Sequence, residues 1–166
     1  MDKKVVIDPM TIPQQIIKLA GPEKPITAQP TAARAIYVSR VVSTGGTVSM
    51  PNNFLGPLDQ FHVWLYGTST NAGVIIGEMS AHVPAGSSVR VKAFSGGSVA
   101  NTSIMEVFVS NSSGGSWVQV LNVTVPQVPV STYTFNAPTG GFQYIAVRGH
   151  NNSNYSDLYV DGAESP

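Results

Sequence analysis

The chain of 166 residues is long enough for one domain with a buried core, and its 42% hydrophobic content is ordinary. It contains no cysteine, which excludes disulfides, thiol catalysis and thiolate metal sites. The net charge of zero combines a basic leader with a mildly acidic body, because residues 1–40 hold six of the nine basic residues but three of the nine acidic ones. No basic cluster is dense enough to indicate nucleic-acid binding.

The first 34 residues differ in pattern from the rest. Residues 11–14 (TIPQ) match a capping box, and Gly21-Pro22 supplies a stop, which predicts one short helix between them. Residues 21–34 contain three prolines and no periodicity, so they are expected to be extended. We therefore predict an N-terminal docking arm, residues 1–34, whose helix contacts neighbouring subunits through Ile12, Ile16, Ile17 and Leu19.

Residues 35–166 are predicted to form an all-β domain, an antiparallel jelly-roll-like sandwich of eight or nine strands. Several runs alternate between apolar and polar residues with period two, as in VRVKA at 89–93. Gly-Gly pairs between the runs suit tight turns. The expected strands are 35–42, 60–67, 73–83, 87–94, 103–110, 116–125, 131–135, 142–149 and 157–163.

No catalytic pattern is present. The three histidines are scattered without H-x-H or H-E-x-x-H spacing, and no G-x-S-x-G sequence occurs. Glu78 and Glu106 lie in strand-like runs and could be paired across a sheet. We therefore expect a protein that is not an enzyme.

Residues 148–164 (RGHNNSNYSDLYVDGAE) gather polar side chains around a loop and the final strand. Asp157, Asp161 and Glu164 could contribute oxygen ligands to a calcium ion, which takes six to eight of them. The alternative is a polar turn in which Asn and Ser bind their own backbone. No other cofactor is expected.

The segments MEVFVSNSSGGSWVQVLNVTV and STYTFNAPTGGFQYIAVRGHNNSNYSDLYVDGAE resemble the C-terminal half of galactose-binding-like jelly rolls, which include discoidin-type domains and carbohydrate-binding modules. The resemblance implies a sandwich that binds glycans through loops at one end, often with a structural calcium ion near the closing strand. It implies ligand contacts from His150, Asn152 and Tyr155. The aromatic platform that such modules use is not obvious in the sequence, since Trp64 lies in an apolar run, Trp117 alternates with the buried set, and only Tyr155 is loop-borne.

The same kind of sandwich is used in virus and phage particles, where an N-terminal arm binds neighbouring subunits. We therefore predict a structural virion component, a capsid decoration or minor virion protein that binds the major capsid protein or copies of itself. Without a signal peptide or a membrane segment, it is expected to assemble in the host cytoplasm. The alternative is a carbohydrate-binding module or adhesin-like protein; under the virion interpretation no glycan binding is expected.

Overall fold

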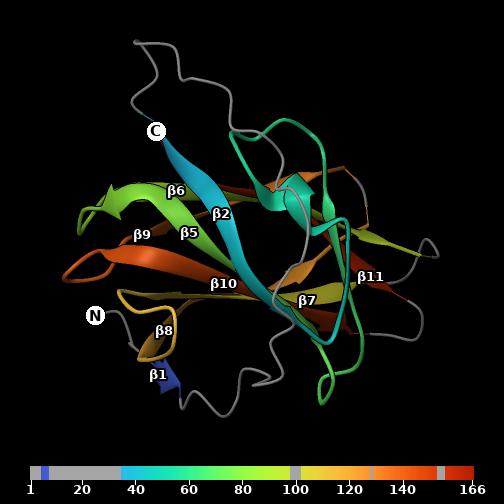
Figure 1. Ribbon diagram of the computed structural model, residues 1–166. Coiled ribbons are helices and arrows are strands. Elements are labelled where there is room, and N and C mark those ends of the chain that lie inside the picture. Colours follow the sequence, from blue (N-terminus) through green and yellow to red (C-terminus); the bar gives the residue numbers. More distant parts are fainter. Residues whose placement is uncertain (1–4, 8–34, 98–101, 128, 153–155) are drawn as a thin grey trace.

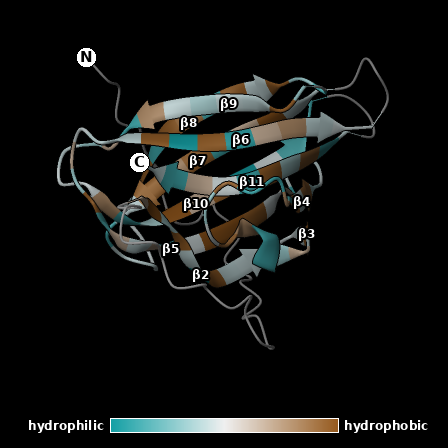
Figure 2. Cartoon of the chain, turned by 90° about the horizontal axis from the view of Figure 1, so that it is seen from above, coloured by the Kyte–Doolittle hydropathy of each residue, from teal (hydrophilic) through white to brown (hydrophobic). Residues whose placement is uncertain are grey.

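The computed structural model describes residues 5–7, 35–97, 102–127, 129–152 and 156–166. Within them, antiparallel strands form two sheets that pack face to face as a β-sandwich (Figures 1 and 2). Apart from a single 3-10 turn, η2 (Pro51–Phe54), these residues contain no helix. None of the described segments is therefore a helix that could span a membrane.

Sheet A has the strand order β1-β8-β7-β10-β5-β2. Every neighbouring pair in it is antiparallel. Its strands are β1 (Val5–Ile7), β8 (Trp117–Val125), β7 (Ser103–Ser110), β10 (Phe142–Asn151), β5 (Gly73–Val83) and β2 (Ile36–Gly45).

Sheet B has the order β3-β4-β11-β6-β9, and it is also antiparallel. Its strands are β3 (Thr47–Ser49), β4 (Val63–Tyr66), β11 (Asp157–Ser165), β6 (Ser88–Gly96) and β9 (Ser131–Asn136). The two sheets join at one corner, where Ile36 and Tyr37 of β2 pair with the end of β11. Seen from above in Figure 2, the two sheets form the two layers of the sandwich.

The fold class predicted from the sequence is confirmed, and all nine predicted strands are present. Alternation along the strands predicts that eight valine and isoleucine side chains point inward, and six of them are fully buried in the core between the sheets. Val118 and Val120 are only partly buried, and both line a groove between β8 and β9. The fully buried six are Val89, Val91, Val107, Val109, Ile145 and Val147.

Two strands were not predicted, β1 and β3. β3 is a three-residue strand formed after a tight turn at Gly46, whose φ of 64° favours glycine. β1 belongs to the segment that the sequence assigned to the docking arm, and it pairs with β8 of the same chain. The predicted arm helix, with Ile12, Ile16, Ile17 and Leu19, lies outside the described residues. The docking arm therefore stays a prediction.

Candidate functional site

The outer face of sheet B carries aromatic side chains on three adjacent strands. In β4, Val63 and Leu65 point into the core, so Trp64 and Tyr66 between them point outward. The same alternation turns Tyr159 of β11 and Phe94 of β6 outward, and all four side chains remain partly exposed. We call Trp64, Tyr66, Phe94 and Tyr159 the aromatic row.

Strand register brings the members of the aromatic row into contact. Tyr159 lies opposite Phe94 on one side and opposite Trp64 on the other. The Phe94 and Tyr159 rings are stacked, with centroids 4.6 Å apart and planes 11° apart. The Trp64 and Tyr159 rings are perpendicular at a centroid distance of 5.0 Å, and Tyr66 meets Trp64 edge-on at 6.0 Å. Both arrangements are favoured for aromatic pairs.

A glycine makes room for the central ring of the aromatic row. A Cβ atom on Gly96 would overlap the side chain of Tyr159, so the ring lies directly over the Gly96 backbone. Burial raises the pKa of the Tyr159 hydroxyl, and the nearby Asp157 and Tyr66 raise it further. The hydroxyl is therefore a neutral hydrogen-bonding group at ordinary pH. The hydroxyl groups of Ser49 and Tyr66 are hydrogen-bonded, with Oγ and Oη 2.5 Å apart, at the Tyr66 end of the row.

Two strongly exposed apolar residues lie next to the ends of β3 and β4. Phe61 is 59% exposed just before β4, and Met50 is 50% exposed just after β3. The sequence showed no obvious aromatic platform, and the structure shows that the apolar run around Trp64 is a strand with two faces, one of which is partly exposed.

The loop before β4 is fastened to β11 by carboxylates. Asp161 is buried and accepts hydrogen bonds from the backbone N–H groups of Asp59 (3.1 Å) and Gln60 (2.9 Å). Glu164 accepts one from the Leu58 N–H at 3.3 Å and pairs with an arginine, Arg90, at 2.7 Å. These contacts fix the position of the loop that leads into Trp64.

The same contacts bear on the predicted calcium site. Asp161 and Glu164 direct their carboxylates at loop N–H groups and at Arg90. Burial raises the pKa of Asp157, and Tyr159 of the aromatic row follows two residues later in β11. In the part of the chain that the structure describes, no three acidic or histidine side chains are grouped to hold a metal ion.

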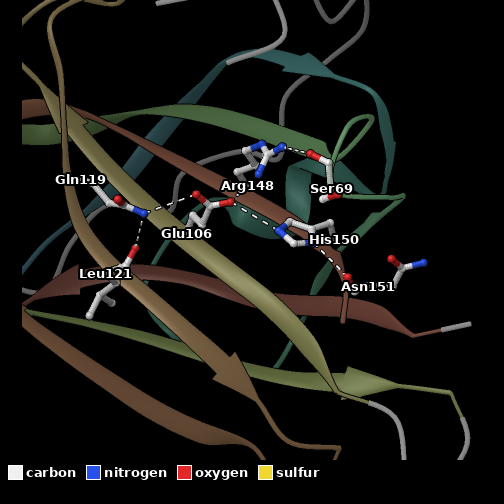
Figure 3. A network of polar contacts seen from close by, with 7 residues as sticks. All are labelled: Ser69, Glu106, Gln119, Leu121, Arg148, His150 and Asn151. Atoms are coloured by element: carbon white, nitrogen blue, oxygen red, sulfur yellow. Dashed lines mark hydrogen bonds and ion pairs between the residues drawn. The ribbon is translucent and has the colours of Figure 1, made fainter. Parts of the chain in front are cut away.

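The outer face of sheet A carries a different arrangement, a charged cluster around Glu106 (Figure 3). The Glu106 carboxylate pairs with Arg148, accepts a hydrogen bond from Gln119 Nε2 at 3.4 Å, and lies 3.5 Å from His150 Nε2. Arg148 also donates to the carbonyl oxygen of Ser69. We call Glu106, Gln119, Arg148 and His150 the Glu106 network.

The Glu106 network is largely enclosed. The Glu106, Arg148 and His150 side chains are 17%, 15% and 12% exposed. Beside them on the same face, a second apolar cluster includes Phe108 and Trp117, each 2% exposed. Trp117 is buried in this cluster on the outer face of sheet A and not in the core between the sheets.

Of the three predicted ligand contacts, one, His150, belongs to the Glu106 network. His150 hydrogen-bonds through Nδ1 to the carbonyl oxygen of Asn151 at 2.9 Å, so both ring nitrogens have neighbours. Asn152 is exposed and donates to Thr102 Oγ1 at 2.9 Å. Tyr155 lies outside the described residues. His150 and Asn152 are therefore close in the sequence, but in the structure their side chains contact different residues.

No protein-family model matches the sequence, and no curated protein is similar to it. Solved structures do match. A variant of a family 29 carbohydrate-binding module superposes with a TM-score of 0.51 at 14% identity, covering 78% of this chain and 81% of the module. The chain shares its jelly-roll β-sandwich fold.

A related structure is a family 29 module variant in complex with mannohexaose, with a TM-score of 0.51, 13% identity, and coverage of 79% of this chain and 88% of the module. A cleaved adhesin domain of Lys-gingipain matches at a TM-score of 0.48 and 16% identity, over 69% of this chain and 77% of that domain. The resemblance predicted from the sequence is confirmed at the level of the fold.

Proposed function

We propose that the protein is a non-catalytic glycan-binding module and that the aromatic row on sheet B is its binding surface. The observation that carries the proposal is the contact of Phe94, Tyr159 and Trp64 across three adjacent strands, with all three rings partly exposed. Aromatic side chains with a few fixed polar groups are the usual lining of sites for small organic ligands.

The chemistry of a sugar fits this surface. An aromatic ring has a negative face and a positive edge, so it attracts the polarised C–H groups on the flat face of a pyranose. The hydroxyls of Ser49, Tyr66 and Tyr159 supply donors and acceptors at the margins for the sugar hydroxyls. The structural neighbours, which are carbohydrate-binding modules, support this proposal.

The ring orientations favour one kind of glycan. Because Trp64 and Tyr159 are perpendicular, the aromatic row is not a flat platform. A flat crystalline polysaccharide would contact only the most protruding ring edges. A single soluble oligosaccharide chain can turn between units and meet a ring face at one position and a ring edge at the next, so we propose soluble chains as the ligand class.

The virion role predicted from the sequence receives no support from the structural neighbours described above, which are carbohydrate-binding modules and an adhesin domain. It stays a prediction from the sequence. The aromatic row supports glycan recognition. Its described contacts are ring contacts and a hydroxyl hydrogen bond, which do not form a pair of catalytic side chains.

The test is binding of wild type and two variants to mannohexaose, cellulohexaose and a panel of soluble polysaccharides, by calorimetry and affinity electrophoresis. Trp64→Ala removes the largest ring of the row, and truncating such an anchor costs about 2 kcal/mol or more, roughly a 30-fold loss of affinity. Tyr144→Ala is the matched control, since it removes a partly exposed aromatic ring from the outer face of sheet A.

We expect Trp64→Ala to lose binding and Tyr144→Ala to keep it, with both variants folded by circular dichroism. Loss of binding in Tyr144→Ala alone would place the site on sheet A and contradict the proposal. Absence of binding by the wild type to the whole panel would contradict glycan recognition itself.

A further inference from the structure

Strand β1 is attached to the domain through one neighbour. Its three residues pair with β8, in the register Val5 with Gln119, Val6 with Val118 and Ile7 with Trp117. Among the described strands, β8 is the only one with which it pairs. A strand of three residues contributes few hydrogen bonds, so this contact alone holds β1 weakly.

The chain connection does not confine β1 to its own β8. β1 and β2 lie at opposite edges of sheet A, five strand positions apart, or roughly 24 Å at 4.8 Å per position. The 28 residues between Ile7 and Ile36 could span up to about 90 Å when extended. The connection is therefore long enough for β1 to reach β8 of another molecule.

The edge of β8 lacks the usual protection against pairing. Edge strands in monomeric proteins commonly carry charges or prolines that discourage the addition of another chain. β8 (WVQVLNVTV) has neither, and it is rich in residues that favour strands.

A groove of about 620 Å³ continues along this edge, between β8 and the edge strand β9. It is lined by residues 118–121 of β8 and 134–136 of β9, together with residues 85–86 and 137–139. Val118, Val120 and Leu121 are only partly buried there. The groove therefore places apolar surface directly beside the β8 residues that pair with β1.

We propose that β1 is exchanged between molecules, so that Val5–Ile7 of one copy pairs with β8 of a second copy. The occupant is a second copy because its β1 has the sequence already seated on this edge, and the exchanged pairing keeps the same register. The exchange is independent of glycan binding.

The absence of native cysteine allows a direct test. Residues opposite each other in an antiparallel pair have Cα atoms about 4.5–5.5 Å apart, within disulfide range. Val6→Cys and Val118→Cys are made as separate single variants of the full chain with different tags, mixed, equilibrated and oxidised. Val6→Cys mixed with Thr124→Cys is the matched control, because Thr124 is an exposed β8 residue away from the β1 contact.

Exchange predicts a disulfide-linked heterodimer of the first mixture that increases with protein concentration and exceeds the control. The double variant Val6→Cys/Val118→Cys is oxidised in parallel and should give both an intramolecular and an intermolecular disulfide. If the double variant gives the intramolecular bond only, and the mixture gives no more heterodimer than the control, the exchange does not occur. If the double variant forms no disulfide, the β1–β8 pairing is itself wrong, and the proposal is overturned with it.

Discussion

The outer faces of sheets A and B differ in the exposure and surroundings of their tryptophan side chains. Both belong to strands whose inward residues build one core, and each carries one of the two tryptophans of the chain. On sheet A, Trp117 is 2% exposed, and the polar groups beside it bind one another in the Glu106 network. On sheet B, Trp64 stays partly exposed among other rings.

The difference shows which face is available for a ligand. A sugar bound at the Glu106 network would have to compete with existing ion pairs and hydrogen bonds, which costs their desolvation and rearrangement. A sugar bound at the aromatic row would cover apolar surface that is now in contact with water, which is favourable. We therefore expect substitutions on sheet A to affect stability and substitutions on sheet B to affect binding.

The largest effect on stability is expected for Glu106→Ala. The substitution leaves the largely enclosed Arg148 without its carboxylate, and removing one partner of a buried pair costs 3–5 kcal/mol; residual exposure reduces this to about 2–3 kcal/mol. The melting temperature should fall by about 5–10 °C in calorimetry. Glycan affinity, measured below the transition, should be unchanged.

The control for that substitution is Glu78→Ala on the same face. Glu78 pairs with Arg40 at 2.5 Å, but the Arg40 side chain is 50% exposed, and such a pair contributes less than about 1 kcal/mol. Equal losses for Glu106→Ala and Glu78→Ala would show that the Glu106 network has no special structural role, and the contrast between the faces would fail.

A smaller effect is expected for Gly96→Ala, on the sheet B face. The added methyl group overlaps the Tyr159 ring, which must move, at a cost of about 1–2 kcal/mol in stability. Because Tyr159 is the centre of the aromatic row, glycan affinity should fall as well. Gly114→Ala is the control, since no atom lies near its added Cβ and its φ is not positive. Unchanged affinity in Gly96→Ala would show that the position of Tyr159 is unimportant.

The smallest effect concerns pH and His62, which contacts Phe94 at the end of the aromatic row. Burial lowers the pKa of His62 below its ordinary value of 6.5, although Asp161 and Asp59 oppose the shift. The unfolded chain therefore binds the proton more readily, and stability should decrease as the pH falls through 6.5, then level off below the lowered pKa.

Thermal unfolding of wild type and His62→Gln between pH 7 and pH 5 measures this contribution. The loss of melting temperature over that interval should be smaller in His62→Gln than in wild type. An identical pH dependence in wild type and His62→Gln would contradict the sign or the presence of the shift.

The sequence predicted the sandwich because alternation with period two is a local property. VRVKA at 89–93 shows which residues of β6 face the core without knowledge of any other strand. The aromatic row depends instead on pairing: Trp64, Phe94 and Tyr159 lie about 30 or more residues apart, and only the order of β4, β11 and β6 brings them together. No local pattern encodes that order.

The pairing of strands also determines the ion-pair partners of Glu78 and Glu106, which the sequence could not show. The sequence suggested that Glu78 and Glu106 could be paired across a sheet, but each binds an arginine on a neighbouring strand, Arg40 and Arg148 respectively. Strand β1 was missed for another reason, since three residues are too short for a recognisable period. The alternation within the run at 60–67 was the one available signal for the exposed Trp64 and Tyr66.

Whether a glycan binds on sheet B or on sheet A can be tested with the two tryptophans as separate reporters. Trp117→Phe leaves Trp64 as the only tryptophan, on sheet B, and Trp64→Phe leaves Trp117, on sheet A. Each variant is titrated with mannohexaose and with cellulohexaose while tryptophan fluorescence and its quenching by acrylamide are recorded. We expect a hexasaccharide to shift the emission and reduce the quenching of Trp64, and to leave the Trp117 signal unchanged. A response of Trp117 without a response of Trp64 would contradict this expectation.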